Sequence, residues 1–134
     1  MTNISKTLQE LVENGTERNP LPYKKGNTIF IGKCTVRKTK KGYIVFEAGK
    51  QVEMFNTLHG ALAMVKCITK KDPSTNVSYL DQMYSKHEED IIFFRHVIEK
   101  TNSQNRKEYL EDRLDDSEHR RRLYKNRLEN IIFN

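Results

Sequence analysis

The chain has few cysteines and no long apolar run, and each absence excludes a class of protein. Its two cysteines, Cys34 and Cys67, are far apart and lack a CxxC partner, so they do not supply the ligands of a zinc site. They are typical of small buried hydrophobes in a reducing compartment. No run of about 18 apolar residues predicts a membrane span, and MTNISKTLQE lacks the basic start and apolar stretch of a secretory signal. We therefore expect an intracellular protein that is not secreted and does not enter a membrane.

The motifs of catalysis and nucleotide binding are also absent. The sequence has no GxSxG, no P-loop and no GxGxxG, and neither cysteine has an obvious histidine base. Neither His87 nor His96 follows a glutamate at three residues, so no di-metal carboxylate site is expected. His59 is a candidate anion contact at a helix start, with exposure without a role as the alternative. The sequence predicts a non-enzyme with no cofactor, no metal and no small-molecule substrate.

Positive charge is concentrated in the middle of the chain. Of the net charge of +6, residues 28–71 carry nine basic and two acidic groups, whereas residues 72–134 carry eleven and thirteen. Such a field favours an anionic neighbour, either nucleic acid or an acidic protein face, and a solvated surface is the alternative. Lysine predominates over arginine here, which suits phosphate attraction more than base reading. The candidate phosphate contacts are Lys38, Lys40, Lys41, Lys70 and Lys71.

The first half of the chain predicts a small antiparallel sheet between helices. An amphipathic helix over 3–14 and an extended linker over 16–27 precede it. A two-residue turn at Gly49-Lys50 would pair Val45 with Met54 and leave both sheet faces partly apolar. One face is then covered by the following helix, and the other needs a lid from the N-terminal helix or from the C-terminal region. The predicted strands are Thr28–Lys38, Tyr43–Ala48 and Gln51–Phe55, and the following helix is Thr57–Lys70.

The second half predicts an antiparallel pair of helices. Apolar residues recur at alternating steps of three and four over 77–100 and again over 110–131, which is the heptad pattern of a coiled coil. If the chain reverses at Thr101 to Asn105, the two patterns meet in order. Ser78 with Asp81 resembles a capping box at the start of the first helix. The predicted pairs are Val77 with Ile131, Leu80 with Leu128, Tyr84 with Tyr124, His87 with Arg121, Ile91 with Ser117, Phe94 with Leu114, and Ile98 with Leu110.

His87 and Arg121 form a polar layer in this otherwise largely apolar seam. Glu88, Asp90 or Glu118 can supply the partners that a charge in such a position needs. A layer of this kind most often fixes the register of a coiled coil, and a pH-sensitive contact is the alternative.

Some apolar residues lie outside the seam, and a two-helix hairpin cannot bury all of them by itself. They pack either on the sheet unit or on another protein chain. The candidate protein contacts are Phe93, Val97, Tyr109, Leu123 and Phe133. The fold predicted overall is α+β: a basic unit over 1–71 with three antiparallel strands between helices, a linker over 72–76, and a helical hairpin over 77–134.

Two resemblances add to these expectations. The segment GYIVFEAGKQVEMFNTLHGALA, residues 42–63, resembles the three-stranded DNA-binding units of phage integrase arms and plant ethylene-response factors. The order of helix, three strands and helix also resembles a double-stranded-RNA-binding domain. Both resemblances imply nucleic-acid binding.

The whole chain, with its DIIFFRHVIEK hairpin, is similar to small accessory proteins of large tailed bacteriophages. That resemblance implies a virion component or an accessory protein, in the host cytoplasm or in the phage particle. We therefore expect a non-catalytic interaction or assembly protein that docks through its hairpin onto a protein partner or its own copies. The alternative is a basic nucleic-acid-binding module with little sequence specificity.

Overall fold

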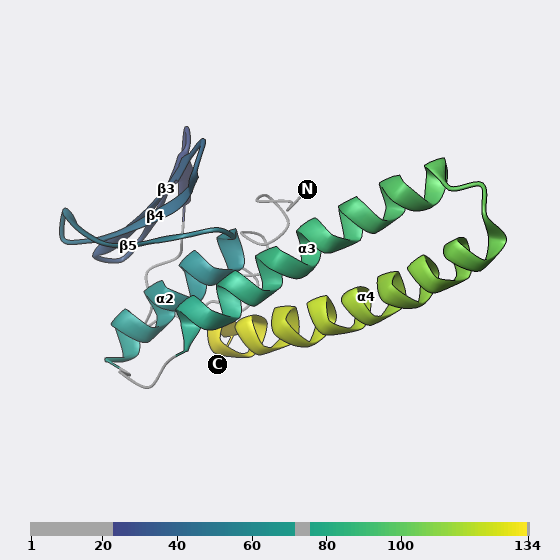
Figure 1. Cartoon of the computed structure of the whole chain (residues 1–134). Coiled ribbons are helices and arrows are strands. Elements are labelled where there is room, and N and C mark those ends of the chain that lie inside the picture. Colours follow the sequence, from purple (N-terminus) through teal and green to yellow (C-terminus); the bar gives the residue numbers. More distant parts are fainter. Residues whose placement is uncertain (1–22, 72–75, 134) are drawn as a thin grey trace.

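A computed structural model describes residues 23–71 and 76–133, and in it the protein is α+β, as predicted (Figure 1). A five-stranded antiparallel sheet carries α2 on one face, and α3 and α4 form a long hairpin that projects from this body. The predicted helix over 3–14 lies outside the described residues. The elements are β1 (Tyr23–Lys25), β2 (Thr28–Ile31), β3 (Cys34–Thr39), β4 (Gly42–Glu47), β5 (Lys50–Phe55), α2 (Leu58–Lys70), α3 (Val77–Lys100) and α4 (Gln104–Phe133).

The sheet has five strands in sequential order, so the prediction of three strands was wrong. The predicted first strand is divided by a turn at Gly32, whose φ of 58° lies in the left-handed region. Gly26, with φ of 62°, makes a similar turn one strand earlier and pairs β1 with β2. Glycine adopts this conformation without steric cost, which lets each reversal use only two residues. As a result, residues 23–25 of the predicted linker belong to the sheet.

The last sheet turn also differs from the prediction, by one residue. Ala48 and Gly49 form it, with φ of 50° and 84°, so that Glu47 pairs with Lys50. From this turn the pairing continues as Phe46 with Gln51, and a β-bulge between Val45 and Phe46 then shifts the register by one residue, so that Val45 pairs with Glu53 and Ile44 with Met54. Alanine rarely takes positive φ, which is why the pattern favours a turn that begins at the glycine. The sheet twist selects the turn with two positive φ values despite that local cost.

The core lies between the inner face of the sheet and α2. Thr57 caps α2: its hydroxyl accepts a hydrogen bond from the Gly60 N–H at 3.0 Å. Alternate residues of the strands point inward, and one stripe of α2 packs on them. The buried residues of this layer are Ile29, Cys34, Val36, Tyr43, Val45, Phe55, Leu58, Ala61, Leu62, Ala63, Val65 and Cys67.

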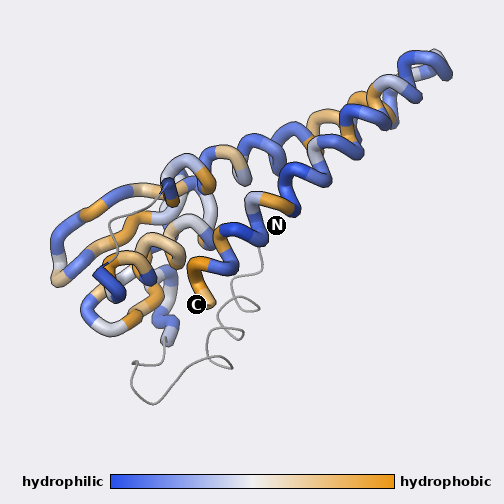
Figure 2. Tube along the Cα trace, turned by 90° about the horizontal axis from the view of Figure 1, so that it is seen from below, coloured by the Kyte–Doolittle hydropathy of each residue, from blue (hydrophilic) through white to orange (hydrophobic). Residues whose placement is uncertain are grey.

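The hairpin of α3 and α4 has the predicted reversal, and its base is part of the same core. Every residue of the predicted seam is buried or half-buried. Near the base, Val77, Tyr84 and Leu128 belong to one cluster with the sheet and α2. At the end of α4, Ile132 is the buried residue and Ile131 is only half-buried, because α4 also packs against α2 there. Beyond this base the hairpin is mostly hydrophilic, with isolated apolar segments (Figure 2).

The sheet unit and the hairpin therefore share a hydrophobic core. The predicted linker over 72–76 lies outside the described residues except for Asn76. The hairpin lies on the α2 side of the sheet (Figure 1), so it does not form the lid expected for the opposite face.

Candidate interaction surfaces

Asp81 connects the hairpin to the start of α2. Its carboxylate accepts hydrogen bonds from the backbone N–H groups of Asn56 and Thr57, both at 2.8 Å, and from the Thr57 hydroxyl at 2.6 Å. The predicted capping box of Ser78 and Asp81 was therefore wrong, since α3 begins after Asn76 without a side-chain cap. A buried carboxylate is more stable with three donors from another element than at the exposed end of its own helix.

Gly60 makes this approach possible because a side chain there would overlap the Asp81 carboxylate. Burial raises the pKa of Asp81, while the hydrogen bonds from Thr57 and Asn56 act in the opposite direction. The contact between α3 and the start of α2, which we call the joint, thus combines the buried acid Asp81, Gly60 and the helix cap Thr57.

The polar layer pairs each of its members with an aromatic ring. The His87 ring stacks on Tyr124, with centroids 5.8 Å apart and planes 9° apart. The Arg121 guanidinium lies 5.3 Å from the Tyr84 ring centroid and binds the Glu88 carboxylate at 3.0 Å. Glu88 is one of the three predicted partners. The rings of the adjacent seam layer thus shield both polar groups.

His87 is buried, and neither ring nitrogen has a hydrogen-bond partner. Asp90 is the nearest carboxylate, with Oδ2 3.8 Å from Nδ1. Burial lowers the pKa of His87, and Lys86 and Arg120 lower it further, while Asp90 and Asp116 oppose this. The folded hairpin therefore favours a neutral imidazole in this layer.

His59 is neither exposed nor at an open anion site, so both expectations for it were wrong. It is 5% exposed, and its Nε2 lies 3.3 Å from Glu129 of α4. Its ring meets Tyr84 edge-on at 5.5 Å. Burial lowers the pKa of His59, partly offset by Glu129. His59 therefore ties α2 to both helices of the hairpin, a long-range contact that no local sequence signal indicates.

One side of the hairpin combines basic and apolar side chains. With the seam at heptad positions a and d, positions c and g of both helices share one side, which we call the basic flank. It carries six basic groups and two acidic ones, Asp90 and Asp116. Its members are Tyr79, Met83, Lys86, Asp90, Phe93, Val97 and Lys100 on α3, and Arg106, Tyr109, Arg113, Asp116, Arg120, Leu123, Arg127 and Asn130 on α4.

The opposite side, at positions b and e, is acidic and holds the body of the protein. Near the base, Asp81 and Ile132 on this side are buried, and Glu129 contacts His59 of α2. The part beyond the body, which we call the acidic flank, is open. Its members are Glu88, Ile92, Arg95 and Glu99 on α3, and Glu108, Glu111, Asp115, Glu118 and Arg122 on α4.

Four of the five predicted protein contacts lie on the basic flank, and the fifth lies elsewhere. Phe93 and Tyr109 are each 60% exposed and Leu123 is 44% exposed, all on the basic flank, where Val97 is half-buried. Phe133 packs partly against the core and lies away from the others. Sequence reasoning missed Tyr79, which is 50% exposed on the same flank, and the heptad register of Phe93 was the signal that could have found it.

The predicted phosphate contacts form two separate groups. Lys38, Lys40 and Lys41 lie at or next to the β3–β4 turn, whereas Lys70 ends α2 and Lys71 follows it. Lys38 pairs with Tyr43, and Tyr43 pairs with Phe55, so the first group lies at the same end of the sheet as Phe55. α2 begins three residues after Phe55 and carries the second group at its other end. The length of α2 therefore separates the two groups. At 1.5 Å per residue that separation is about 20 Å.

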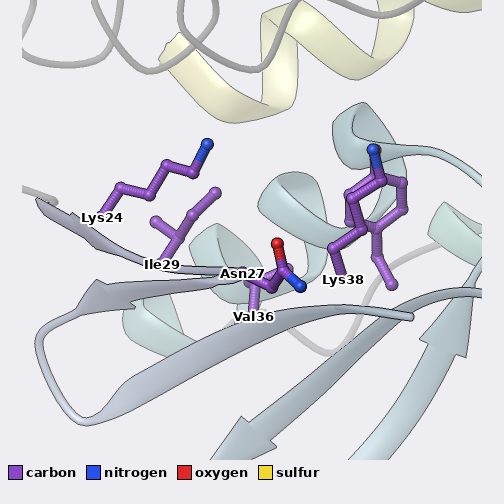
Figure 3. A pocket seen from close by; sticks show the side chains of 6 residues that line it. Lys24, Asn27, Ile29, Val36 and Lys38 are labelled. Carbon is purple, nitrogen blue, oxygen red and sulfur yellow. The ribbon is translucent and has the colours of Figure 1, made fainter.

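A shallow pocket lies beside Lys38, on the inner side of the sheet. Lys24 and Lys38 stand on two sides of it with their amino groups pointing the same way (Figure 3). Asn27, Ile29, Val36 and Tyr43 complete its lining, which contains no carboxylate or thiol. The two amino groups make this lining suited to a small anion.

The outer face of the sheet carries aromatic and basic side chains. Tyr23 stacks on Phe30, with centroids 4.9 Å apart, and the Arg37 guanidinium lies 5.6 Å from the Phe46 ring centroid. Among the described elements, no helix packs on this face.

Residues 23–71 and 76–133 contain neither a cluster of metal ligands nor a helix that could span a membrane. In that part of the chain, no three His, Cys, Asp or Glu side chains come together in a way that would hold a metal ion. No helix there combines the length and the apolar character that crossing a bilayer requires.

Comparison with protein-family models, with curated proteins and with solved structures found no match for this chain.

Proposed function

We propose that the protein is a non-catalytic interaction or assembly protein that docks through the basic flank of its hairpin. The observation that carries this proposal is the gathering of Tyr79, Phe93, Tyr109 and Leu123, all exposed, on the side of the hairpin that faces away from α2. Exposed apolar side chains scattered singly are normal, whereas several on one face mark an interaction surface.

The shape of the hairpin supports the same proposal. Its seam uses apolar and aromatic pairs to hold two helices together, and the rings on the flank stay largely exposed, although Tyr79 meets Tyr124 and Phe93 meets Phe94 edge-on. Burying such rings against a partner contributes about 25 cal/mol per Å² of apolar surface. Arginine and tyrosine, which interleave on α4, are also the residues enriched in binding hot spots.

The resemblance to accessory proteins of tailed bacteriophages supports a phage setting for this function. In that setting the protein is a structural part of the virion or an accessory factor, and its partner is a protein.

Site-specific photo-crosslinking in the cell of origin tests the docking surface. A photoreactive phenylalanine analogue is placed at Phe93 or Tyr109, and the matched control carries it at Gln82, which is exposed on α3 between the two flanks. We expect covalent protein adducts from Phe93 and Tyr109 and none from Gln82. Equal labelling at all three positions, or none at any, would reject the basic flank as a docking surface.

The second candidate function is a nucleic-acid-binding module with little sequence preference. The separate observation that favours it is the cationic and aromatic outer face of the sheet, because bases stack on rings and phosphates are attracted to Lys and Arg.

The two lysine groups provide a matched test of this candidate. In the triple variant Lys38→Gln, Lys40→Gln and Lys41→Gln, the salt dependence of binding should flatten by about 0.9 per lost phosphate contact on duplex DNA. The variant Lys70→Gln with Lys71→Gln, about 20 Å away by helix length, should leave the slope unchanged if the sheet end is the site. Absence of any shift with DNA or RNA at low salt would eliminate this function.

A further inference from the structure

We infer that the docking partner of the basic flank is the acidic flank of a second copy of this chain, so that hairpins associate side by side in one direction. This inference rests on the proposed function and names the occupant of the same surface. It follows from the way in which the heptad register separates the charges of the hairpin.

Arginine recurs once per heptad along α4. Arg106, Arg113, Arg120 and Arg127 all occupy position g, which places them in one line about 10.5 Å apart at 1.5 Å per residue. All four are exposed. Only Arg120 has an ion pair among the described residues, with Asp116 at 3.1 Å. The basic flank therefore keeps most of its positive charge available to a partner.

The acidic flank has the opposite arrangement. Glu99, Glu111 and Asp115 are exposed and form no ion pair among the described residues. Arg95 is neutralised by Glu118 at 3.1 Å. Two sides of one rod thus carry unsatisfied charges of opposite sign, which is electrostatic complementarity between copies.

Each flank also has an apolar centre near the tip of the hairpin. Ile92, 69% exposed, is the most exposed large hydrophobic side chain of the described chain and lies among the acidic residues. On the basic flank, Phe93, Val97 and Tyr109 lie at about the same level of the rod. Contact between the two flanks would cover Ile92 and these rings together.

Charge argues against association of two like flanks. A symmetric pair through the basic flanks would face six basic groups on each copy with six on the other, and like charges across an interface are costly. Contact of unlike flanks is heterologous, so a row of copies always keeps one free basic flank at one end and one free acidic flank at the other. Such contacts close into a ring or continue as a filament.

The contact between two copies is small. The open part of the acidic flank spans about 20 Å along two helices, which gives roughly 400 Å² per partner from helix dimensions, about half of a standard interface. We therefore expect weak pairwise association that depends strongly on concentration and salt.

The test uses the purified full-length chain in sedimentation velocity, with nucleic acid removed. Wild-type protein should sediment as species larger than a monomer at about 50 mM salt and return toward monomer at about 500 mM, as screening shortens the reach of the charges. The variant Arg106→Glu with Arg113→Glu should remain monomeric at both salt concentrations. So should the variant Glu111→Arg with Asp115→Arg.

The decisive measurement mixes the two charge-reversed variants, one altered on the basic flank and the other on the acidic flank. Each variant alone opposes like charges, but in the mixture both kinds of contact are complementary again, so assembly should return. The matched control is Asp112→Arg, on α4 between the two flanks, which should assemble as wild type does. Unfolding curves for every variant should show that the fold is retained.

Three results would overturn the inference. They are a monomer at all salt concentrations, assembly that neither reversed variant affects, and a mixture that stays monomeric while each variant is folded. A monomer whose Phe93 still crosslinks to a different protein, or to nucleic acid, would overturn the second-copy assignment. The protein adduct alone would leave the proposed function intact, whereas a monomer without adducts would reject both.

Discussion

At the scale of single residues, the joint between the hairpin and the body depends on one buried carboxylate. Asp81 is 2% exposed and accepts three hydrogen bonds from Asn56 and Thr57, which lie 25 and 24 residues earlier in the chain. These bonds fix where α3 crosses the start of α2. The adjacent Gly60 sets how closely the two helices approach.

We predict that Asp81→Ala lowers the free energy of unfolding by about 1–3 kcal/mol, because it leaves the buried N–H and hydroxyl donors of Thr57 without the Asp81 carboxylate. Urea unfolding followed by circular dichroism measures the change. Ser78→Ala is the matched control, since the Ser78 hydroxyl makes only a long 3.4 Å contact with Glu53. An equal loss from both substitutions would refute the role given to Asp81.

A methyl group at Gly60 should also destabilise the fold, by about 1–3 kcal/mol, because the Asp81 carboxylate occupies its space. Gly49→Ala tests a different glycine, which has open space and a positive φ of 84°. There the cost should arise from the backbone alone. Combining Gly60→Ala with Asp81→Ala should cost less than the sum of the two, and simple additivity would contradict the proposed overlap.

At the scale of elements, the hairpin was largely predictable from sequence because a heptad pattern is local and repeats. α3 has the predicted bounds of Val77–Lys100, and α4 begins within the predicted reversal. The sheet was less predictable. Its strand count depends on glycine turns of two residues. Its last register depends on positive φ at Ala48, which residue preferences oppose, and on a β-bulge between Val45 and Phe46.

The candidate surfaces, like the fold, were predictable where the signal is local and repeats, and not where it depends on contacts distant in sequence. Phe93, Tyr109 and Leu123 were found from their positions outside the seam, and the structure places all three on one flank. The contacts of Asp81 and His59 join residues 24 to 70 apart in the chain, so no window of sequence indicates them.

The buried histidines predict how stability depends on pH. Because burial lowers the pKa of His87 and His59 below the usual 6.5, the unfolded chain binds protons at pH values where the folded chain does not. Their contribution is therefore complete above pH 6.5 and decreases as the pH falls through that value. Each unit of separation between the folded and unfolded pKa corresponds to about 1.4 kcal/mol.

Replacement of His87 by Phe isolates one of the two histidines. The variant keeps a ring to stack on Tyr124, and it should lose less stability than wild type between about pH 7 and pH 5. Asp81, whose pKa is raised by burial, titrates in both proteins, so its effect cancels in the comparison. Thermal unfolding across this range measures the difference, and parallel pH profiles would contradict a buried neutral His87.

At the scale of the whole molecule, Tyr84, Leu128 and Ile132 of the hairpin belong to the core cluster of the sheet and α2. We therefore expect the base of the hairpin and the body to unfold together. A chain that ends at residue 71 would leave α2 without the packing of α3 and α4 against it. Loss of assembly in such a truncation would therefore report loss of the fold.

Shortening the hairpin by one heptad on each helix tests this arrangement without disturbing the core. Deletion of residues 94–100 together with 104–110 keeps the seam in register and retains residues 101–103 as the loop. We expect a cooperative unfolding transition and lost assembly, because the deletion removes Val97, Arg106 and Tyr109 from the basic flank. Urea unfolding and sedimentation velocity measure the two properties, and unfolding of the shortened chain would place essential packing at the tip.

The anchoring of the hairpin gives it the mechanics of a lever. Its fulcrum is the contact of Asp81 with the residues that link β5 to α2, while α3 extends about 36 Å from base to tip. A sideways force on the tip therefore becomes a torque on the joint between sheet and helix. In a ring or filament of such rods, strain at the contacts between neighbours would reach the sheet of every copy.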